Sequence, residues 1–239
     1  QFTGIGAKMM GDTFTATIHA EDENGNAFIG EPKSTTIANE LLTVIRKANA
    51  TDTIKTLGVD MLNYGAAAQA YFGYNAENPV NAALTEEEKA YGTLETPTVT
   101  NTMSKTSTGA VTIVLPAVTL GSKVTLNMMF NTTNYTGDKS KLTYKITDVT
   151  TNTVVATGPL VQTSGNIYKC VYDDVGAARM RKNVTIGVYD ENDVLVSQVQ
   201  TWSVESYIAN TLRASNSTQE IKTLLEAMIK YGDSAAAYL

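Results

Sequence analysis

The chain has 239 residues, of which 43% are hydrophobic, and a formal net charge of −6. This apolar fraction is enough for a packed core and argues against wholesale disorder, while the acidic balance lacks the footprint of a nucleic-acid-binding protein. No apolar run approaches the ~20 residues that span a bilayer, and the single cysteine and single histidine exclude a disulfide framework and a zinc cluster.

The N-terminal part predicts a β-hairpin followed by two helices. Residues 14–20 and 27–29 are predicted strands, and the Asp-Glu-Asn-Gly-Asn run at 22–26 predicts the turn between them, because Asn-Gly favours positive φ. The second helix carries apolar and small residues at helical spacing, namely Ile54, Leu57, Met61, Gly65, Ala68 and Phe72.

Residues 75–97 predict a linker with one short helix. Pro79 and Pro97 mark its edges, and Thr85-Glu86-Glu87-Glu88 has the capping-box pattern that starts a helix of one or two turns.

Residues 98–202 have a different pattern, in which short strand-like runs alternate with turn signals. Five runs lie at 99–103, 110–115, 124–130, 142–148 and 154–161, and three more surround Ile167, Val184 and Val194. Regular spacing of this kind is typical of a β-sandwich. We therefore expect one immunoglobulin-like antiparallel sandwich.

Two further helices are predicted at 203–239. Ser203 is a predicted N-cap with Glu205 in the first turn, and Ser217-Thr218-Gln219-Glu220 is a second capping-box pattern.

The chain contains an internal repeat. Ile54-Lys55-Thr56-Leu57 recurs as Ile221-Lys222-Thr223-Leu224, at a spacing of 167. Ile37-Ala38-Asn39 matches Ile208-Ala209-Asn210 at a spacing of 171, and Gly6-Ala7 matches Gly176-Ala177 at a spacing of 170. Residues 1–74 and about 170–239 are therefore two copies of one unit, and the first copy lacks the five preceding strands.

The repeat keeps one glycine inside its second helix, at Gly65 and Gly232. A glycine there costs about 1 kcal/mol relative to alanine, so we expect it to allow close approach of another backbone. Phosphate binding is disfavoured, because no helix starts there and no glycine-rich loop surrounds it.

The predicted fold class is α+β, mainly β. It comprises the sandwich, the two-helix hairpin that follows it, and a truncated copy with a β-hairpin and two helices. The expected domains are the truncated module at 1–74, the linker at 75–97, and a complete module at 98–239 that divides into the sandwich (98–202) and the helix hairpin (203–239).

The residues offer little for catalysis. His19 lies in a predicted strand where the second copy has Tyr189, and Cys170 lies in an alternating run, so both are expected to pack as ordinary strand residues. Paired-carboxylate hydrolysis needs only two acids, but the acids cluster in turns and in first helical turns, where they have structural roles.

Two kinds of ligand site are considered. Calcium suits the oxygens of the turns at 22–26 and 190–193, although neither has the EF-hand pattern and a solvated hairpin tip is the preferred interpretation. For a glycan, Tyr135 is the best candidate for an exposed aromatic, while Trp202 is expected to seal the junction between sheet and helix. Tyr64, Tyr71, Tyr231 and Tyr238 are expected to pack against the sheet.

The helix stretch Leu62-Asn63-Tyr64-Gly65-Ala66-Ala67-Ala68-Gln69-Ala70-Tyr71-Phe72, preceded by Phe14-Thr15-Ala16-Thr17-Ile18, resembles a repeat module of large secreted surface proteins of gut-dwelling Gram-positive bacteria. The resemblance covers both copies, with Lys230, Asp233 and Ser234 in place of Asn63, Ala66 and Ala67 in the second. Such modules accompany adhesins, carbohydrate-active enzymes and immunoglobulin-binding, superantigen-like proteins. The resemblance implies an extracellular, secreted or wall-attached, non-catalytic repeat, and it transfers no catalytic residue.

We therefore expect a binding module and not an enzyme, with no cofactor and no metal. The first expected partner is a host protein, with immunoglobulin suggested by the resemblance alone; neighbouring repeats of the same polypeptide are also expected partners. The alternatives are a glycan-binding module and a structural stalk that displays other domains. Neither nucleic acid nor a membrane span is expected.

Overall fold

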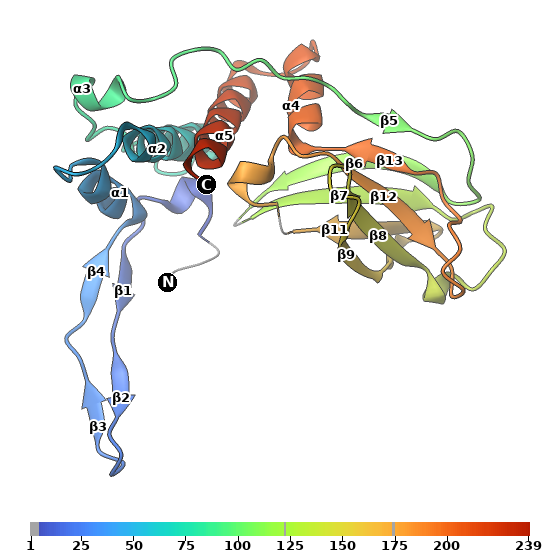
Figure 1. Ribbon diagram of the computed structural model, residues 1–239, viewed down its shortest axis with the longest axis horizontal. Coiled ribbons are helices and arrows are strands. Elements are labelled where there is room, and N and C mark those ends of the chain that lie inside the picture. The colour runs from blue at the N-terminus through green and yellow to red at the C-terminus, as the bar shows by residue number, and fades with distance from the viewer. Residues whose placement is uncertain (1–4, 122, 174) are drawn as a thin grey trace. The chain divides into compact units, whose positions relative to one another are not determined.

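The computed structural model describes residues 5–121, 123–173 and 175–239 (Figure 1). They form two compact units, Ile5–Glu95 and Thr96–Ala237. Helices account for 31% and strands for 28% of the chain, and the paired strands are antiparallel. The expectation of a mainly β chain is therefore wrong, because the helices of the two copies contribute as much regular structure as the sheets.

The first unit has a hairpin of strands followed by helices. In chain order it holds η1 (Ala7–Met9), β1 (Phe14–Ala16), β2 (His19–Glu21), β3 (Ala27–Ile29), β4 (Lys33–Thr35), α1 (Ile37–Ile45), α2 (Asp52–Phe72) and α3 (Glu86–Lys89). β1 pairs with β4 and β2 pairs with β3, so the four short strands make one long ribbon that extends away from the helices of this unit (Figure 1). The predicted turn is confirmed, with Gly25 at φ 81°.

Side-chain caps fix the helices of this unit. Thr36 and Thr51 accept hydrogen bonds from the backbone N–H groups of Asn39 and Ile54 at the starts of α1 and α2. The predicted capping box at Thr85 is confirmed, since its side chain and that of Glu88 exchange hydrogen bonds with each other's backbone N–H.

The segment that the sequence predicts to be a linker contributes to the core of the first unit. Val80 and Leu84 are buried with residues from η1, α1 and α2. Two buried polar side chains of α2 hold this segment: Gln69 accepts a hydrogen bond from the N–H of Val80 at 2.8 Å, and Asp60 accepts from the N–H of Thr93 at 2.9 Å. Buried polar groups that find partners in this way specify one path for the returning chain.

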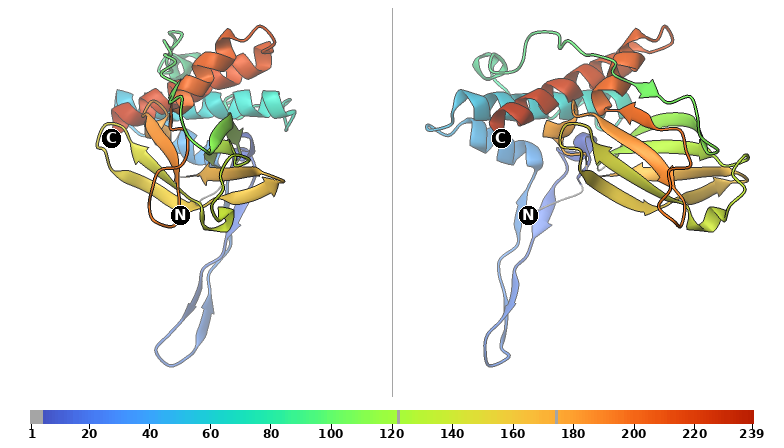
Figure 2. Two further views of the ribbon diagram at one scale, coloured as in Figure 1. Left: turned by 90° about the vertical axis from the view of Figure 1, so that its right-hand side faces the viewer. Right: turned by 45° about the vertical axis from the view of Figure 1, so that its right-hand side comes forward.

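The second unit contains two antiparallel sheets and two long helices. In chain order it holds β5 (Ser104–Lys105), β6 (Thr112–Leu120), β7 (Val124–Asn131), η2 (Lys139–Lys141), β8 (Thr143–Asp148), β9 (Val154–Pro159), β10 (Val161–Ser164), β11 (Ile167–Tyr172), η3 (Ala177–Arg179), β12 (Val184–Tyr189), β13 (Gln200–Trp202), α4 (Val204–Arg213) and α5 (Gln219–Tyr238). The strand orders are β10-β11-β7-β6 and β5-β13-β12-β8-β9. Figure 2 shows the two sheets as separate layers.

Three strands of these sheets show burial with a period of two residues. Every second residue is buried in β11, in β12 and, from Leu126 on, in β7, including Met128, Cys170 and Ile186, as expected for strands with one face on a core. Trp202 at the end of β13 is fully buried next to the start of α4, as the sequence predicts.

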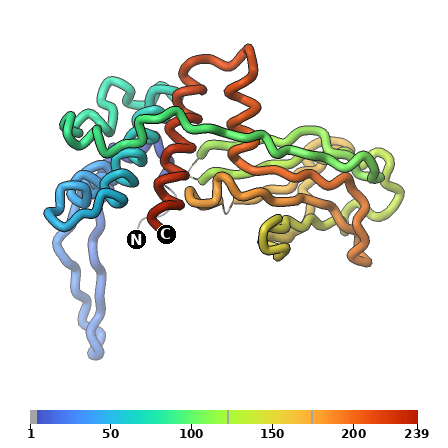
Figure 3. The backbone as a smooth tube through the Cα atoms, turned by 45° about the horizontal axis from the view of Figure 1, so that its top comes forward, coloured from blue at the N-terminus to red at the C-terminus, as the bar shows by residue number. Residues whose placement is uncertain are grey.

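An extended segment before β5 runs past α4 (Figure 3). The backbone N–H groups of Thr100 and Thr102 donate to Glu205 at 3.0 Å and to Ser206 at 3.1 Å. At the next helix, the N-cap of α5 is Thr218 and not Ser217 as the pattern suggests, because the hydroxyl of Ser217 instead donates to the carbonyl of Thr211.

The two copies share strand register. In the first copy Phe14 is opposite Thr35, and the matched residues of the second copy, Val184 and Trp202, are opposite each other too; the next two pairs of β1–β4 and β12–β13 also correspond. The strand entering each hairpin therefore keeps the same spacing as the Gly6 and Gly176 match.

The match between the first helices needs a correction. The N-caps Thr36 and Ser203 occupy equivalent positions, because the second residue of each helix, Ala38 or Glu205, donates its N–H to the carbonyl of Met10 or Met180. The spacing inferred from Ile-Ala-Asn is thus wrong by four residues, and the helices share the spacing of the Ile-Lys-Thr-Leu match. Four residues are about one helical turn, so the shifted alignment keeps the same face inward and looks plausible in sequence.

The repeated helix glycine lies against the 3₁₀ turn in both copies. A Cβ at Gly65 would lie 2.9 Å from Sδ of Met10 and 3.3 Å from the Ala7 carbonyl oxygen. At Gly232 it would lie 3.0 Å from Sδ of Met180 and 3.2 Å from the Ala177 carbonyl oxygen. The predicted close approach of a backbone is therefore confirmed.

Candidate binding surfaces

The single histidine and the single cysteine both lie on strands. His19 is exposed on β2, opposite Ile29 in the ribbon. Cys170 is buried on β11, and its burial raises the pKa of the thiol to about 12, so it remains protonated at neutral pH.

The two acidic turns are built in the same way and use their own carboxylates. Asp22 accepts hydrogen bonds from the Asn26 side chain and from the backbone N–H groups of Asn26 and Asn24, which together lower the pKa of the carboxyl group. Asp190 likewise accepts from the N–H groups of Asn192 and Val194. The Asp22 and Asp190 oxygens considered for calcium thus serve the turns. The described residues contain no cluster of three or more His, Cys, Asp or Glu that could hold a metal ion.

Tyr135, the sequence's candidate for an exposed aromatic, is half-buried. Its ring lies against Gly137, where a Cβ would be 2.4 Å from the phenol oxygen. Burial, followed by the carboxylates of Asp190 and Glu191, raises the pKa of this phenol. On the helices, Tyr64 is buried, whereas Tyr71 and Tyr238 are exposed.

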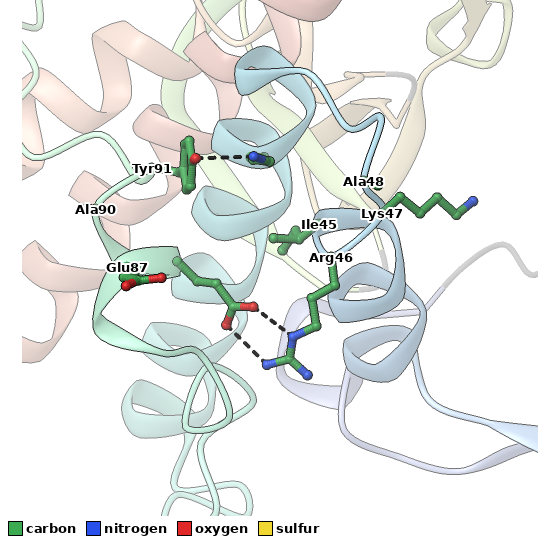
Figure 4. A pocket seen from close by; sticks show the side chains of 9 residues that line it. Ile45, Arg46, Lys47, Ala48, Glu87, Ala90 and Tyr91 are labelled. Carbon is green, nitrogen blue, oxygen red and sulfur yellow. Dashed lines mark hydrogen bonds and ion pairs between the residues drawn. The ribbon is translucent and has the colours of Figure 1, made fainter.

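The first unit has a cleft of about 680 Å³ between the end of α1, the start of α2 and α3 (Figure 4). Arg46 and Glu88 face each other across it in a two-pronged ion pair, with Nε 2.7 Å from Oε1 and Nη2 3.1 Å from Oε2. Arg46 also donates to the carbonyl of Ala83 at 2.8 Å. The Lys55 Nζ atom lies 4.4 Å from the centre of the Tyr91 ring, in a cation–π contact.

The strongest charges of this cleft neutralise each other. The Arg46 guanidinium and the N–H of Thr85 hold the pKa of Glu88 at about 2. The ion pair therefore acts as a clamp between α1 and α3, and the remaining charged residues of the wall include Lys47 and Glu87, which are exposed. The capping box is visible in the sequence, but the partner of Glu88 lies 42 residues away and no local signal indicates it.

The second unit has an apolar edge on β6. Val114 and Leu115 are 52% and 53% exposed, because the register with β7 shifts between Ile113 and Leu115 and turns two successive side chains outward. Val111 exchanges backbone hydrogen bonds with Val196 and Gln198. Beyond Ile113, no further strand of the described chain pairs with this edge.

The ribbon of the first unit carries a second apolar surface. Ile18, Phe28 and Ile29 are between 64% and 70% exposed, and among the described residues no third strand pairs with β1–β4 or β2–β3. A two-stranded ribbon has only marginal stability by itself in water. An exposed apolar surface on such a ribbon is therefore unusual in a folded domain.

Comparison of the chain with protein-family models, curated proteins and solved structures finds no significant match. In the described residues, no helix combines the length and the apolar character that crossing a membrane requires.

Proposed function

We propose that the chain is a non-catalytic binding module of an extracellular, secreted or wall-attached bacterial surface protein, and that its partner is a host protein. Immunoglobulin is the first candidate, on the resemblance of the Leu62–Phe72 helix stretch to surface-protein repeats. We further propose that the four- and five-stranded sheets form an immunoglobulin-like sandwich, an interpretation that their antiparallel pairing and alternating burial favour.

The observation that carries this proposal is the pair of adjacent apolar side chains, Val114 and Leu115, on the open edge of β6. Neighbouring exposed apolar residues at a sheet edge provide desolvation energy for a protein partner. Pro116 follows directly and has no N–H, which limits extension of the sheet by an added strand. Contact through the side chains is therefore the mode we propose.

The test is binding of purified immunoglobulin to the immobilised chain. We expect measurable binding that falls at least tenfold in Val114→Asp/Leu115→Asp. Val154→Asp is the matched control, since Val154 is 54% exposed on another strand, and it should bind like the unaltered chain. Absence of binding to immunoglobulin, with no host protein enriched from serum or mucosal secretions, would overturn the proposal.

The structural-stalk alternative has a specific observation of its own, namely the repeated strand register and the repeated glycine contact in both copies. Stacked repeats of one unit are common in elongated proteins. A stalk should bind neither immunoglobulin nor glycans, so the experiment above separates it from the first proposal. The glycan alternative rests on Tyr135 alone, which is half-buried.

A further inference from the structure

The ribbon of the first unit has a completed counterpart within the same chain. The β1–β4 pairing matches β12–β13 residue for residue over three pairs. Both ribbons also end in the same turn: Asp22 and Asp190 each accept two backbone hydrogen bonds, and Gly25 and Asp193 occupy the same positive-φ position. The second copy therefore shows which strands flank this kind of ribbon when its sheet is complete.

In the second copy both edges of the ribbon are paired. β8 pairs with β12 over six residues, and β5 pairs with β13 over two. In the described part of the first copy, β1–β4 and β2–β3 remain two-stranded sheets. No third strand of the described chain thus pairs with the outer edges of the first ribbon, and an open strand edge is a template for strand pairing.

One face of the ribbon supports the same conclusion. In the strand alignment that pairs Phe14 with Val184, Ala16 and Ile18 correspond to Ile186 and Val188. The latter two are 1% and 0% exposed in the core between the sheets, whereas Ala16 is exposed and Ile18 is 70% exposed. The first copy keeps apolar residues at core-facing positions that nothing in the described chain covers.

We propose that this ribbon is the docking surface for the strands of a further module of the same type, built like residues 104–172 and joined in the same polypeptide ahead of residue 1. Those strands would pair with both edges of the ribbon and cover Ala16 and Ile18. The sandwich of a second copy of this chain cannot fill this role, because its own β12–β13 already occupies the corresponding place. The inference concerns contacts between repeats and does not depend on the identity of any host partner.

The test is a fusion that places residues 98–170 ahead of Gln1 of the full chain, so that Gln1 takes the place of Val171 and the strand alignment of the two copies is preserved. Hydrogen exchange is measured by mass spectrometry on peptides that cover residues 14–35. In the unfused chain we expect these amides to exchange rapidly, and in the fusion at least 100-fold more slowly, near the rate of β12.

Two variants of the fusion test whether the face of the ribbon that carries Ala16 and Ile18 becomes covered. Ile18→Asp should abolish the protection, because it puts a charge on the covered face, while leaving the unfused chain unchanged. His19→Asp is the matched control on the opposite face, where the second copy has the half-exposed Tyr189, and it should keep the protection.

Either of two results overturns the proposal. In the first, the amides of the added strands are not protected from hydrogen exchange. In the second, the added strands are protected while the amides of residues 14–35 still exchange rapidly. Protection of residues 14–35 in the unfused chain that rises with protein concentration would also overturn it, since a second copy would then be the occupant.

Discussion

At the scale of single residues, Glu88 shows how an acid that looks available in sequence is used structurally. Its carboxylate accepts from the Arg46 guanidinium and from the N–H of Thr85. Hydrogen bonds from a guanidinium and from a backbone N–H stabilise the ionised carboxylate relative to the protonated acid. The pKa of Glu88 therefore falls from 4.5 to about 2, and stability becomes linked to pH.

The sign of this linkage defines a first prediction. Because the folded pKa lies below the unfolded value, the stabilisation is present above pH 4.5 and is lost as the pH falls toward 2. Glu88→Gln, which keeps an oxygen for the cap, should lower the free energy of unfolding at pH 7 by about 1 kcal/mol. Below pH 2, where Glu88 is protonated in the folded and unfolded states, the variant and the unaltered chain should be equally stable.

Urea denaturation at pH 7 and at about pH 1.5, below the folded pKa of Glu88, measures this difference. Glu87→Gln is the control, because Glu87 is exposed beside the same pair, and it should change stability little at either pH. An equal loss in Glu88→Gln at both pH values would show that the ion pair is not responsible.

At the scale of elements, the second helix of each copy packs on a 3₁₀ turn through its glycine. The intrinsic helix preference of alanine over glycine, about 1 kcal/mol, favours Gly→Ala in an isolated helix. In the folded chain, the added Cβ at Gly65 would lie 2.8 Å from Val80 and 2.9 Å from Met10, and overpacking of this kind costs about 1–3 kcal/mol. Steric contact and helix preference therefore act in opposite directions.

The second prediction is that the steric contact of the added Cβ outweighs the helix preference of alanine. Gly65→Ala should destabilise the chain by about 1 kcal/mol or more, as measured by thermal or urea unfolding. Gly232→Ala should cost less, because its nearest contact is 3.0 Å, to Sδ of Met180, and a thioether can move. A gain in stability at Gly65 would contradict the packing explanation and leave the repeated glycine without a physical reason.

A charged cluster distinguishes the second copy from the first. Arg181 binds Glu205 and Asp233 and donates to the carbonyl of Thr98 at 3.0 Å. The three matched positions of the first copy hold small residues, Gly11, Ala38 and Ala66. All three charges are thus replaced together, as expected if they act as one group.

This leads to a third prediction, on coupling. Arg181→Met alone should destabilise the second unit by about 3 kcal/mol, because it leaves the buried Glu205 without its cation. The triple variant Arg181→Met/Glu205→Ala/Asp233→Ala should lose less stability than that single variant. Urea unfolding of the single, double and triple variants provides the cycle, and losses that simply add would mean that the three residues act independently.

Local elements could be predicted from the sequence because their signals are local. The hairpin turn at 22–26, the capping box at Thr85 and the helix stripe around Gly65 each lie within a few residues. The core position of Val80 and the partner of Arg181 could not, since they depend on groups 11 and 52 residues away. The one-turn error in aligning the first helices arises because helical periodicity fixes the face but not the register.

At the scale of the whole molecule, the chain is two compact units, each with its own second-helix core. Leu62 on α2 and Ile229 on α5 are matched positions in the alignment that pairs Ile54 with Ile221, and both are fully buried. Truncation of either to alanine removes the same kind of packing and should cost about 3 kcal/mol. The two substitutions therefore probe whether each unit is a cooperative folding unit.

The fourth prediction is that each truncation lowers the stability only of the unit that contains it. Leu62→Ala should speed hydrogen exchange in α1 and α2 at least tenfold while leaving β7 and β12 unchanged. Ile229→Ala should do the reverse, with faster exchange in α4, α5 and the strands of the second unit and no change in α2. Exchange measured by mass spectrometry on both variants distinguishes this from a single cooperative molecule, in which either substitution would speed exchange everywhere by the same factor.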